Sequence, residues 1–258
     1  FFLIMFTSKD DLTSEYGVDM EIGKFVADRE VPEDNLYWKN RLLYIIPMPG
    51  YLFIPLYMDI QFRLGLPKAE LLSEQHLQLL EAILHSAAKL ESKVITVEEH
   101  IAECIALTRP QCKNPSFLQD LIYYFLGEKE KATVTLGTPY KSLNRADAYL
   151  FSLCYFDFDI TFKKRLVDAW YALISYYLIV DDLEDIQTDF EQQEENAVLE
   201  AGLSDQGAKA IEALIHQSYY VMNTVNPVIA NRIDHKRQLM NVKGIIDAFL
   251  QKKQQPKA

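Results

Sequence analysis

The amino-acid sequence predicts an all-α protein built as a single-domain helical bundle. Glycine is scarce, with 9 among 258 residues, strand-like runs are few, and long segments carry apolar residues at helical spacing. Hydrophobic residues make up 49% of the chain, which is ample for a buried core. No segment rich in Gly, Ser or Pro divides the sequence, so we expect one domain over residues 1–258, with a polar tail at about 251–258.

Helical patterns are spread over the N-terminal half. Residues 33–67 mix aromatic side chains with prolines, and proline breaks a helix at interior positions, so short helices joined by kinks are predicted there. At Thr96 the hydroxyl can accept from a free backbone amide, and the acidic residues after it suit a first helical turn. The helices predicted in this half run from Lys68 to Leu90, from Thr96 to Arg109 and from Asn114 to Gly127.

The C-terminal half contains the one strand-like stretch, Lys131–Gly137. It is single and short, and an extended loop explains it equally well. Ser204 is expected to cap a helix, and Pro227 is expected to interrupt the helical pattern. The helices predicted here run from Ser142 to Phe156, from Thr161 to Thr188, from Ser204 to Asn223 and from Ile229 to Leu250.

Charge, cysteine usage and the first residues limit the partners and the compartment. The net charge of −11 argues against nucleic acid, because phosphate backbones require clustered Lys and Arg. Cys104, Cys112 and Cys154 have neither the spacing of a zinc site nor that of a disulfide framework, which favours a reducing compartment and a cytoplasmic location. The apolar opening at residues 1–6 is far shorter than a membrane span and is interpreted as a truncated or mid-helix start, so no transmembrane segment is expected.

The most informative stretch runs from Tyr176 to Asp185, where an apolar and aromatic segment is followed by four carboxylates. Side chains four residues apart lie side by side on a helix, so Asp181 and Asp185 should project together. Their charges repel, and the partial negative charge of the helix C-terminus adds to this repulsion. A divalent cation such as Mg²⁺, which prefers carboxylate oxygens, would relieve it. The competing interpretation is a solvated acidic helix end.

The helix predicted over residues 161–188 is apolar around most of its circumference. Such a helix is typical of the centre of a bundle, so we expect it to be flanked on most sides. Its main apolar stripe consists of Leu166, Ala169, Leu173, Tyr176, Val180 and Leu183.

The acidic stretch also carries a resemblance to a known family. Asp181-Asp182-Leu183-Glu184-Asp185 fits a DDxxD motif, and Lys141-Ser142 precedes it by 40 residues (181 − 141 = 40). This pair resembles the isoprenoid synthases, the all-α superfamily of trans-prenyl diphosphate synthases and class I terpene synthases. In the prenyl synthases, a late second aspartate-rich motif follows a helix that ends in apolar residues, and a Lys-Thr pair at a similar distance before it grips diphosphate. The resemblance covers about residues 140–190.

The resemblance implies a bundle of isoprenoid-synthase type with a central cavity. The function that it implies is a divergent class I isoprenoid synthase, which ionises or transfers an allylic prenyl diphosphate with Mg²⁺. Metal ions neutralise the leaving group, and aromatic walls stabilise the carbocation. The partner would be a prenyl diphosphate or another lipid-like small molecule, with a homodimer as one expected assembly. The implied site consists of Asp181, Asp182 and Asp185 as catalytic metal ligands, with Lys141, Arg63 and Tyr177 as substrate-binding residues.

Aromatic residues at helical spacing supply candidates for the cavity wall, although most such residues belong to an ordinary core. A basic cluster near the C-terminus is a further candidate for diphosphate binding, against a solvated face. The aromatic candidates are Tyr123, Tyr124, Tyr155, Phe156, Trp170, Tyr177, Tyr219 and Tyr220, and the basic cluster is Arg232, His235, Lys236 and Arg237.

The chain departs from the family at the first aspartate-rich motif, which is absent. Residues 63–67 (Arg-Leu-Gly-Leu-Pro) are a degenerate form of the Arg-Arg-Gly-x-Pro turn that follows this motif in the family, and Asp59 is the only carboxylate just ahead of it. The glycine and lysine pattern that normally follows the second motif is also missing. Two other spacings occur: Asp181, Asp185 and Asp189 as in squalene- or phytoene-synthase-like chains, and Glu184, Thr188 and Gln192 at terpene-cyclase spacing without the matching residues.

Three functional hypotheses follow from these observations. The first is the Mg²⁺-dependent isoprenoid enzyme, favoured by the acidic motif and Lys141. The second is a catalytically degenerate helical-bundle protein that binds a lipid-like ligand or a protein partner, favoured by the missing first motif. The third is an unrelated bundle in which residues 181–185 form a chance surface motif.

Overall fold

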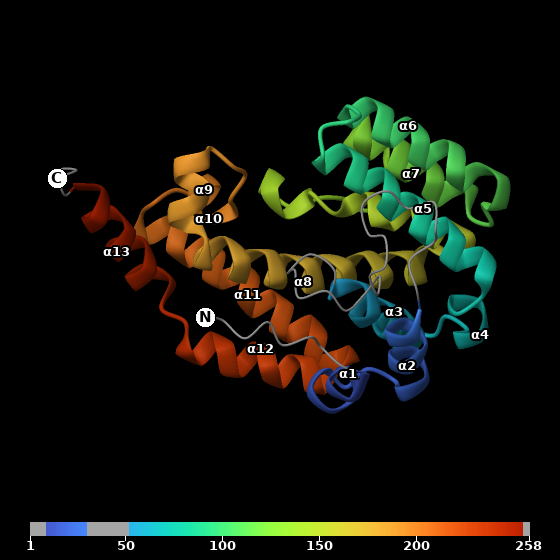
Figure 1. Ribbon diagram of the computed structural model, residues 1–258, viewed down its shortest axis with the longest axis horizontal. Helices are drawn as coiled ribbons and strands as arrows, with labels where there is room; N and C mark the ends of the chain where they lie inside the picture. The colour runs from blue at the N-terminus through green and yellow to red at the C-terminus, as the bar shows by residue number, and fades with distance from the viewer. Residues whose placement is uncertain (1–8, 30–51, 255–258) are drawn as a thin grey trace.

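The computed structural model describes residues 9–29 and 52–254, and all regular structure within these ranges is helical (Figure 1). The all-α prediction is therefore confirmed, and the strand-like stretch at 131–137 is a loop apart from its first residue. Three predicted features lie wholly or partly outside the described residues: the apolar opening at 1–6, residues 33–51 of the kinked region predicted over 33–67, and the last four residues of the tail.

The helices follow one another through short connections. The α-helices are α1 (Lys9–Tyr16), α2 (Met20–Asp28), α3 (Phe53–Leu64), α4 (Lys68–Leu71), α5 (Glu74–Glu91), α6 (Val97–Thr108), α7 (Pro115–Phe125), α8 (Ile160–Glu184), α9 (Ile186–Gln192), α10 (Ala197–Ala201), α11 (Asp205–Val225), α12 (Pro227–Leu239) and α13 (Val242–Gln254). The 3₁₀ helices are η1 (Arg109–Gln111), η2 (Lys129–Lys131), η3 (Lys141–Asn144) and η4 (Asp147–Tyr155).

Helix α8 is the central element, as predicted. Its 25 residues span about 37 Å, and it packs against α3, α10 and α11. Figure 1 shows α8 crossing the middle of the molecule, with α5, α6 and α7 on one side and α11 and α12 on the other. One hydrophobic cluster joins Leu12 near the N-terminus to Phe249 near the C-terminus, so the described helices share a core. Within the described ranges, no helix is both long and apolar enough to cross a membrane.

Local capping explains why several helix starts were predictable. The Thr96 hydroxyl accepts from the Glu99 amide while the Glu99 carboxylate accepts from the Thr96 amide, which forms a capping box. Asn114 caps α7 and Ser204 caps α11, each through its side-chain oxygen. Pro227 occupies the first position of α12, where the missing N–H has no cost, and Asn226 caps that helix.

Three predicted helices are shorter than expected, because side chains within them cap a new helix or because the backbone leaves the helical region. The helix predicted over Lys68–Leu90 breaks into α4 and α5, since Ser73 caps α5. The helix predicted to Thr188 ends at Glu184, and a new one begins after Asp185. The last predicted helix is divided at Met240, which is extended, and the Asn241 side chain accepts from the Gly244 amide at the start of α13. Helix α13 continues to Gln254, into the predicted tail.

The segment predicted as an α-helix over 142–156 forms the 3₁₀ helices η3 and η4 instead. All nine residues of η4 are buried, so the segment has no polar face. It packs against α5, α6 and α7, and residues three apart stack in register along a 3₁₀ helix. Tertiary packing on all sides therefore decides whether this segment forms an α-helix or a 3₁₀ helix, and the periodicity of apolar residues cannot distinguish the two.

Candidate functional site

The acidic motif occupies the last turn of α8 and the residue that follows it. Asp182 is buried, with 1% of the residue exposed, while Asp181 is half-buried and Asp185 is exposed. Asp185 ends the helix, and its amide donates to the Asp181 carbonyl at 2.9 Å. The three carboxylates thus meet three different environments although they lie within five residues.

Arg145 neutralises the two aspartates of the acidic motif that lie within α8. Its guanidinium is 3.2 Å from Asp182 Oδ1 and 3.4 Å from Asp181 Oδ2, and it also donates to the Ser142 carbonyl at 3.2 Å. The second carboxylate oxygen of Asp182 accepts from the Ala197 amide at 2.7 Å. Both oxygens of Asp182 are therefore occupied by groups of the protein itself.

The corner between α8 and α10 is closed by a second polar side chain. The Asn196 amide donates to the Asp182 carbonyl at 2.6 Å and to Asp189 Oδ2 at 2.8 Å, and its oxygen caps α10. This bonding satisfies a carbonyl that the end of α8 would otherwise leave free. The acidic end is accordingly tied to the helices after it.

The carboxyl pKa values in this cluster are shifted mainly by burial. Burial raises the pKa of Asp182 to about 6, against the opposing effects of Arg145 and the Ala197 amide. Burial also raises the pKa of Asp181; Arg145 lowers it, and the nearby charges of Asp185 and Asp189 raise it further. Asp181 is thus close to like charges, as the helical spacing predicted.

The carboxylates of the acidic motif have different partners in this structure. Asp182 points to Arg145 and Ala197, and in the described part of the chain no group of three or more His, Cys, Asp or Glu side chains is arranged to hold a metal ion. Mg²⁺ binding by Asp181, Asp182 and Asp185 remains a prediction that this arrangement does not test.

The residues expected to bind substrate lie apart from one another. Lys141 is 84% exposed and pairs with Glu195 at 2.5 Å, close to the acidic end. Arg63 pairs with Asp59 at 2.6 Å and donates to the Gly17 carbonyl, at the end of α3 that adjoins α1 and α2. Tyr177 is half-buried within α8 and packs edge-on against Tyr176. Each of these three side chains thus contacts a different partner.

A second carboxylate, which the sequence did not point to, lies deep in the core. Asp147, at the start of η4, has no exposed surface and accepts three hydrogen bonds from neutral donors. Tyr124 and Tyr171 donate to Oδ2 at 2.5 and 2.8 Å, and the Trp170 indole donates to Oδ1 at 2.9 Å. Burial raises the pKa of Asp147 to about 6, against these hydrogen bonds, which lower it. Two of the expected cavity aromatics, Tyr124 and Trp170, are thus used to hold this carboxylate.

The Asp147 network reaches a pocket through Tyr171. The Gly137 amide donates to the Tyr171 hydroxyl at 2.7 Å; Gly137 has a φ of 83°, and a Cβ there would lie 2.9 Å from Tyr124. Only glycine fits this close approach of the loop without strain. The pocket has a volume of about 170 Å³ and lies between this loop, α8 and α11. It is lined by Thr135, Gly137, Thr138, Pro139, Asp168, Tyr171, Ala172, Ser175, Leu214, Gln217 and Ser218.

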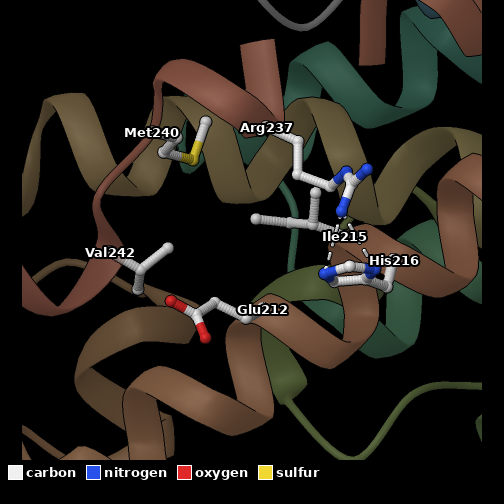
Figure 2. A pocket seen from close by; sticks show the side chains of 6 residues that line it. All are labelled: Glu212, Ile215, His216, Arg237, Met240 and Val242. Carbon is white, nitrogen blue, oxygen red and sulfur yellow. Dashed lines mark hydrogen bonds between the residues drawn. The ribbon is translucent and has the colours of Figure 1, made fainter. Parts of the chain in front are cut away.

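A different pocket, of about 250 Å³, involves one member of the predicted basic cluster (Figure 2). Arg237 and His216 meet at its edge, and Arg237 also forms an ion pair with Asp234. Figure 2 shows the Glu212 carboxylate across the pocket from the Arg237 guanidinium. The other members of the cluster diverge: Arg232 pairs with Glu15, and Lys236 pairs with Glu184.

Comparisons with protein-family models, curated proteins and solved structures gave no match.

Proposed function

We propose that the protein is a non-catalytic helical-bundle protein that binds a small ligand. One observation carries the proposal: four of the charged groups expected to handle a metal–diphosphate complex already pair with oppositely charged residues of the protein. Arg145 neutralises Asp181 and Asp182, and Glu195 and Asp59 neutralise Lys141 and Arg63. A diphosphate would have to displace these pairs before it could bind, which costs binding energy.

The pocket between α8, α11 and the 135–139 loop is our candidate binding site. Its one charged lining residue is Asp168, an exposed residue of α8 whose pKa is raised by partial desolvation. The buried side chains of Ser175 and Ser218 add hydroxyl groups. Tyr171, held by Asp147 and the Gly137 amide, gives the pocket a fixed wall. A carboxylate among hydroxyls suits a small polar molecule with an amine or other hydrogen-bond donors. The volume of about 170 Å³ is small for a prenyl chain.

Ligand binding is tested by thermal-shift and calorimetric titration with short primary amines, the matching alcohols and a prenyl alcohol. We expect the amines to raise the melting temperature and the matching alcohols to raise it less. Asp168→Asn should abolish the difference, whereas Asp157→Asn, the same change at an exposed aspartate between η4 and α8, should leave it intact. A rise in melting temperature with the prenyl alcohol alone would contradict the amine proposal and favour a lipid-like ligand.

The second candidate function is the Mg²⁺-dependent isoprenoid synthase, in a bundle of that family's type with a central cavity. It is favoured by the charge repulsion around Asp181, whose neighbours Asp185 and Asp189 raise its pKa. A cation placed there would relieve this repulsion. Its residues would be those of the acidic motif, with Lys141 reaching the diphosphate.

Calorimetry with pyrophosphate, with and without Mg²⁺, separates the two candidates. The binding-protein proposal expects no Mg²⁺-dependent pyrophosphate binding, and no pyrophosphate release from a panel of allylic diphosphates. The enzyme candidate expects both, together with their loss in the double variant Asp181→Ala and Asp185→Ala. Robust release that depends on Asp181 would overturn the binding-protein proposal.

A further inference from the structure

Two of the three cysteines lie together although they are far apart in the sequence. Cys112 follows η1 and is partly exposed, while Cys154 is a fully buried residue of η4. The amides of Lys113 and Asn114 both donate to the Cys154 carbonyl, at 2.8 and 3.3 Å. These bonds fix the backbone next to Cys112 against the backbone of Cys154, which places the two cysteines beside each other. Both cysteines are free in this structure.

The two thiols differ in reactivity. The neighbouring Cys154 thiol and the Asn114 amide lower the pKa of Cys112 to about 7, although partial burial opposes this. Burial raises the pKa of Cys154 well above its usual range. The thiolate is the form that reacts with oxidants, so Cys112 combines solvent access with nucleophilic character. Cys154 is a buried, neutral thiol beside it. A partly exposed cysteine of lowered pKa beside a second thiol is the arrangement of a redox-sensitive pair.

We propose that Cys112 and Cys154 form a modification site at which a peroxide produces an intramolecular disulfide. In the first step the Cys112 thiolate attacks hydrogen peroxide; an S–O bond forms, the O–O bond breaks, and hydroxide leaves to become water. In the second step the Cys154 sulfur attacks the Cys112 sulfenic acid; the S–S bond forms, the S–O bond breaks, and the Cys154 proton leaves with the departing oxygen as a second water. Two thiols lose two electrons, and one peroxide is reduced to two waters.

The disulfide would add a covalent link between the segment that joins η1 to α7 and the end of η4, where two backbone hydrogen bonds already connect the two segments. Closing a loop restricts the unfolded chain, so the oxidised protein should unfold at a higher temperature than the reduced one. The inference is independent of the ligand-binding proposal, because neither cysteine lines the pocket beside Tyr171.

The test uses fully reduced full-length protein treated with hydrogen peroxide at low protein concentration. Remaining thiols are blocked with iodoacetamide, and a non-reducing digest is mapped by mass spectrometry. We expect one cross-linked peptide pair that contains Cys112 and Cys154, is lighter by two hydrogen atoms than the separate peptides, and disappears with dithiothreitol. Three alkylated cysteines, a disulfide that includes Cys104, or only links between different molecules would overturn the proposal.

Variants then assign the two roles. Cys104→Ser is the matched control, because Cys104 is buried beside His100 and burial raises the pKa of its thiol to about 12; it should form the same disulfide as the wild type. Cys112→Ser, at a partly exposed position, should form no intramolecular disulfide. Cys154→Ser should stop at a Cys112 sulfenic acid that dimedone traps. If this buried variant does not fold, the wild-type peptide map still decides the proposal.

Discussion

Two buried carboxylates, Asp182 within helix α8 and Asp147 bonded to Trp170 and Tyr171 of that helix, are held in different ways. Asp147 is surrounded by three neutral donors, whereas Asp182 meets the positive charge of Arg145 and one backbone amide. Burial raises the pKa of each to about 6. Arg145 keeps 31% of its side chain exposed, while Asp147 and its donors Tyr124 and Trp170 are buried.

This difference shows that the number of carboxylates in a motif does not measure how strongly each is held. The acidic end of α8 is rich in charge, but solvent reaches Asp181, Asp185 and Arg145 and screens their interactions. The isolated Asp147 is held where water does not reach, so each of its hydrogen bonds should matter more. We therefore expect substitutions at Asp147 to affect stability more than substitutions at the acidic motif.

The largest effect is expected for Asp147→Ala. This change leaves the hydroxyls of Tyr124 and Tyr171 and the Trp170 indole without their acceptor, and two of these groups are buried. The free energy of unfolding should fall by about 3–5 kcal/mol, because each buried orphaned donor costs about 1–3 kcal/mol. Urea denaturation measures it, with Asp157→Ala at an exposed position as control, expected within about 0.5 kcal/mol of wild type. Equal effects of the two variants would refute the difference between core and surface.

The next effect concerns pH. Because the pKa of Asp147 is raised to about 6 in the folded state, the folded protein holds this proton more tightly than the unfolded chain does. The stabilisation is fully present below about pH 4 and is lost as pH rises through about 6, for a total of about 3 kcal/mol. His76, whose pKa is lowered to about 4 by burial, acts in the opposite direction as pH falls.

The contribution of Asp147 is therefore isolated by comparing wild type with Asp147→Asn, which retains His76 and cannot ionise at residue 147. The stability of the wild type relative to this variant should decline between pH 4 and pH 7, as measured by urea denaturation at each pH. A constant difference over this range would mean that the pKa of Asp147 is not raised in the folded protein.

A smaller effect is expected at the acidic end. Arg145→Ala leaves Asp182 buried without its cation, and we expect a loss of about 1–3 kcal/mol, because solvent reaches the arginine and screens the pair. In a double-mutant cycle with Asp182→Asn, the second substitution should recover much of this loss. Arg165→Ala, at an exposed arginine of α8, serves as control. Additive effects of Arg145→Ala and Asp182→Asn would show that the pair contributes no coupling energy.

Sequence reasoning succeeded where the determinants are local. The helix starts at Thr96, Asn114 and Ser204 depend on residues within one turn, and the central position of α8 follows from its apolar circumference. It failed where packing decides, as in η4, and where one side chain starts a new helix, as at Ser73 and Asn241.

The polar networks were not predicted because their members are distant in sequence, and no motif or periodicity connects them. Arg145 reaches Asp182 across a separation of 37 residues, and Asp147 accepts from Trp170 across 23. A lone aspartate at the head of an apolar run has no periodic partner, so nothing in the sequence indicated three donors around it. The sequence indicated that the acidic motif concentrates negative charge, but only the fold shows that Arg145 neutralises part of it.

The central position of α8 has a consequence for how the molecule opens. Because α8 packs against α3 from the N-terminal part of the chain and against α10 and α11 from the C-terminal part, its backbone amides become accessible only when both sets of contacts separate. Amide hydrogens in the middle of α8 should therefore exchange with solvent only through global unfolding. Those of α1 and α13, near the ends of the described chain, should exchange through local fraying. The two halves of the chain would then unfold as one cooperative unit joined by this helix.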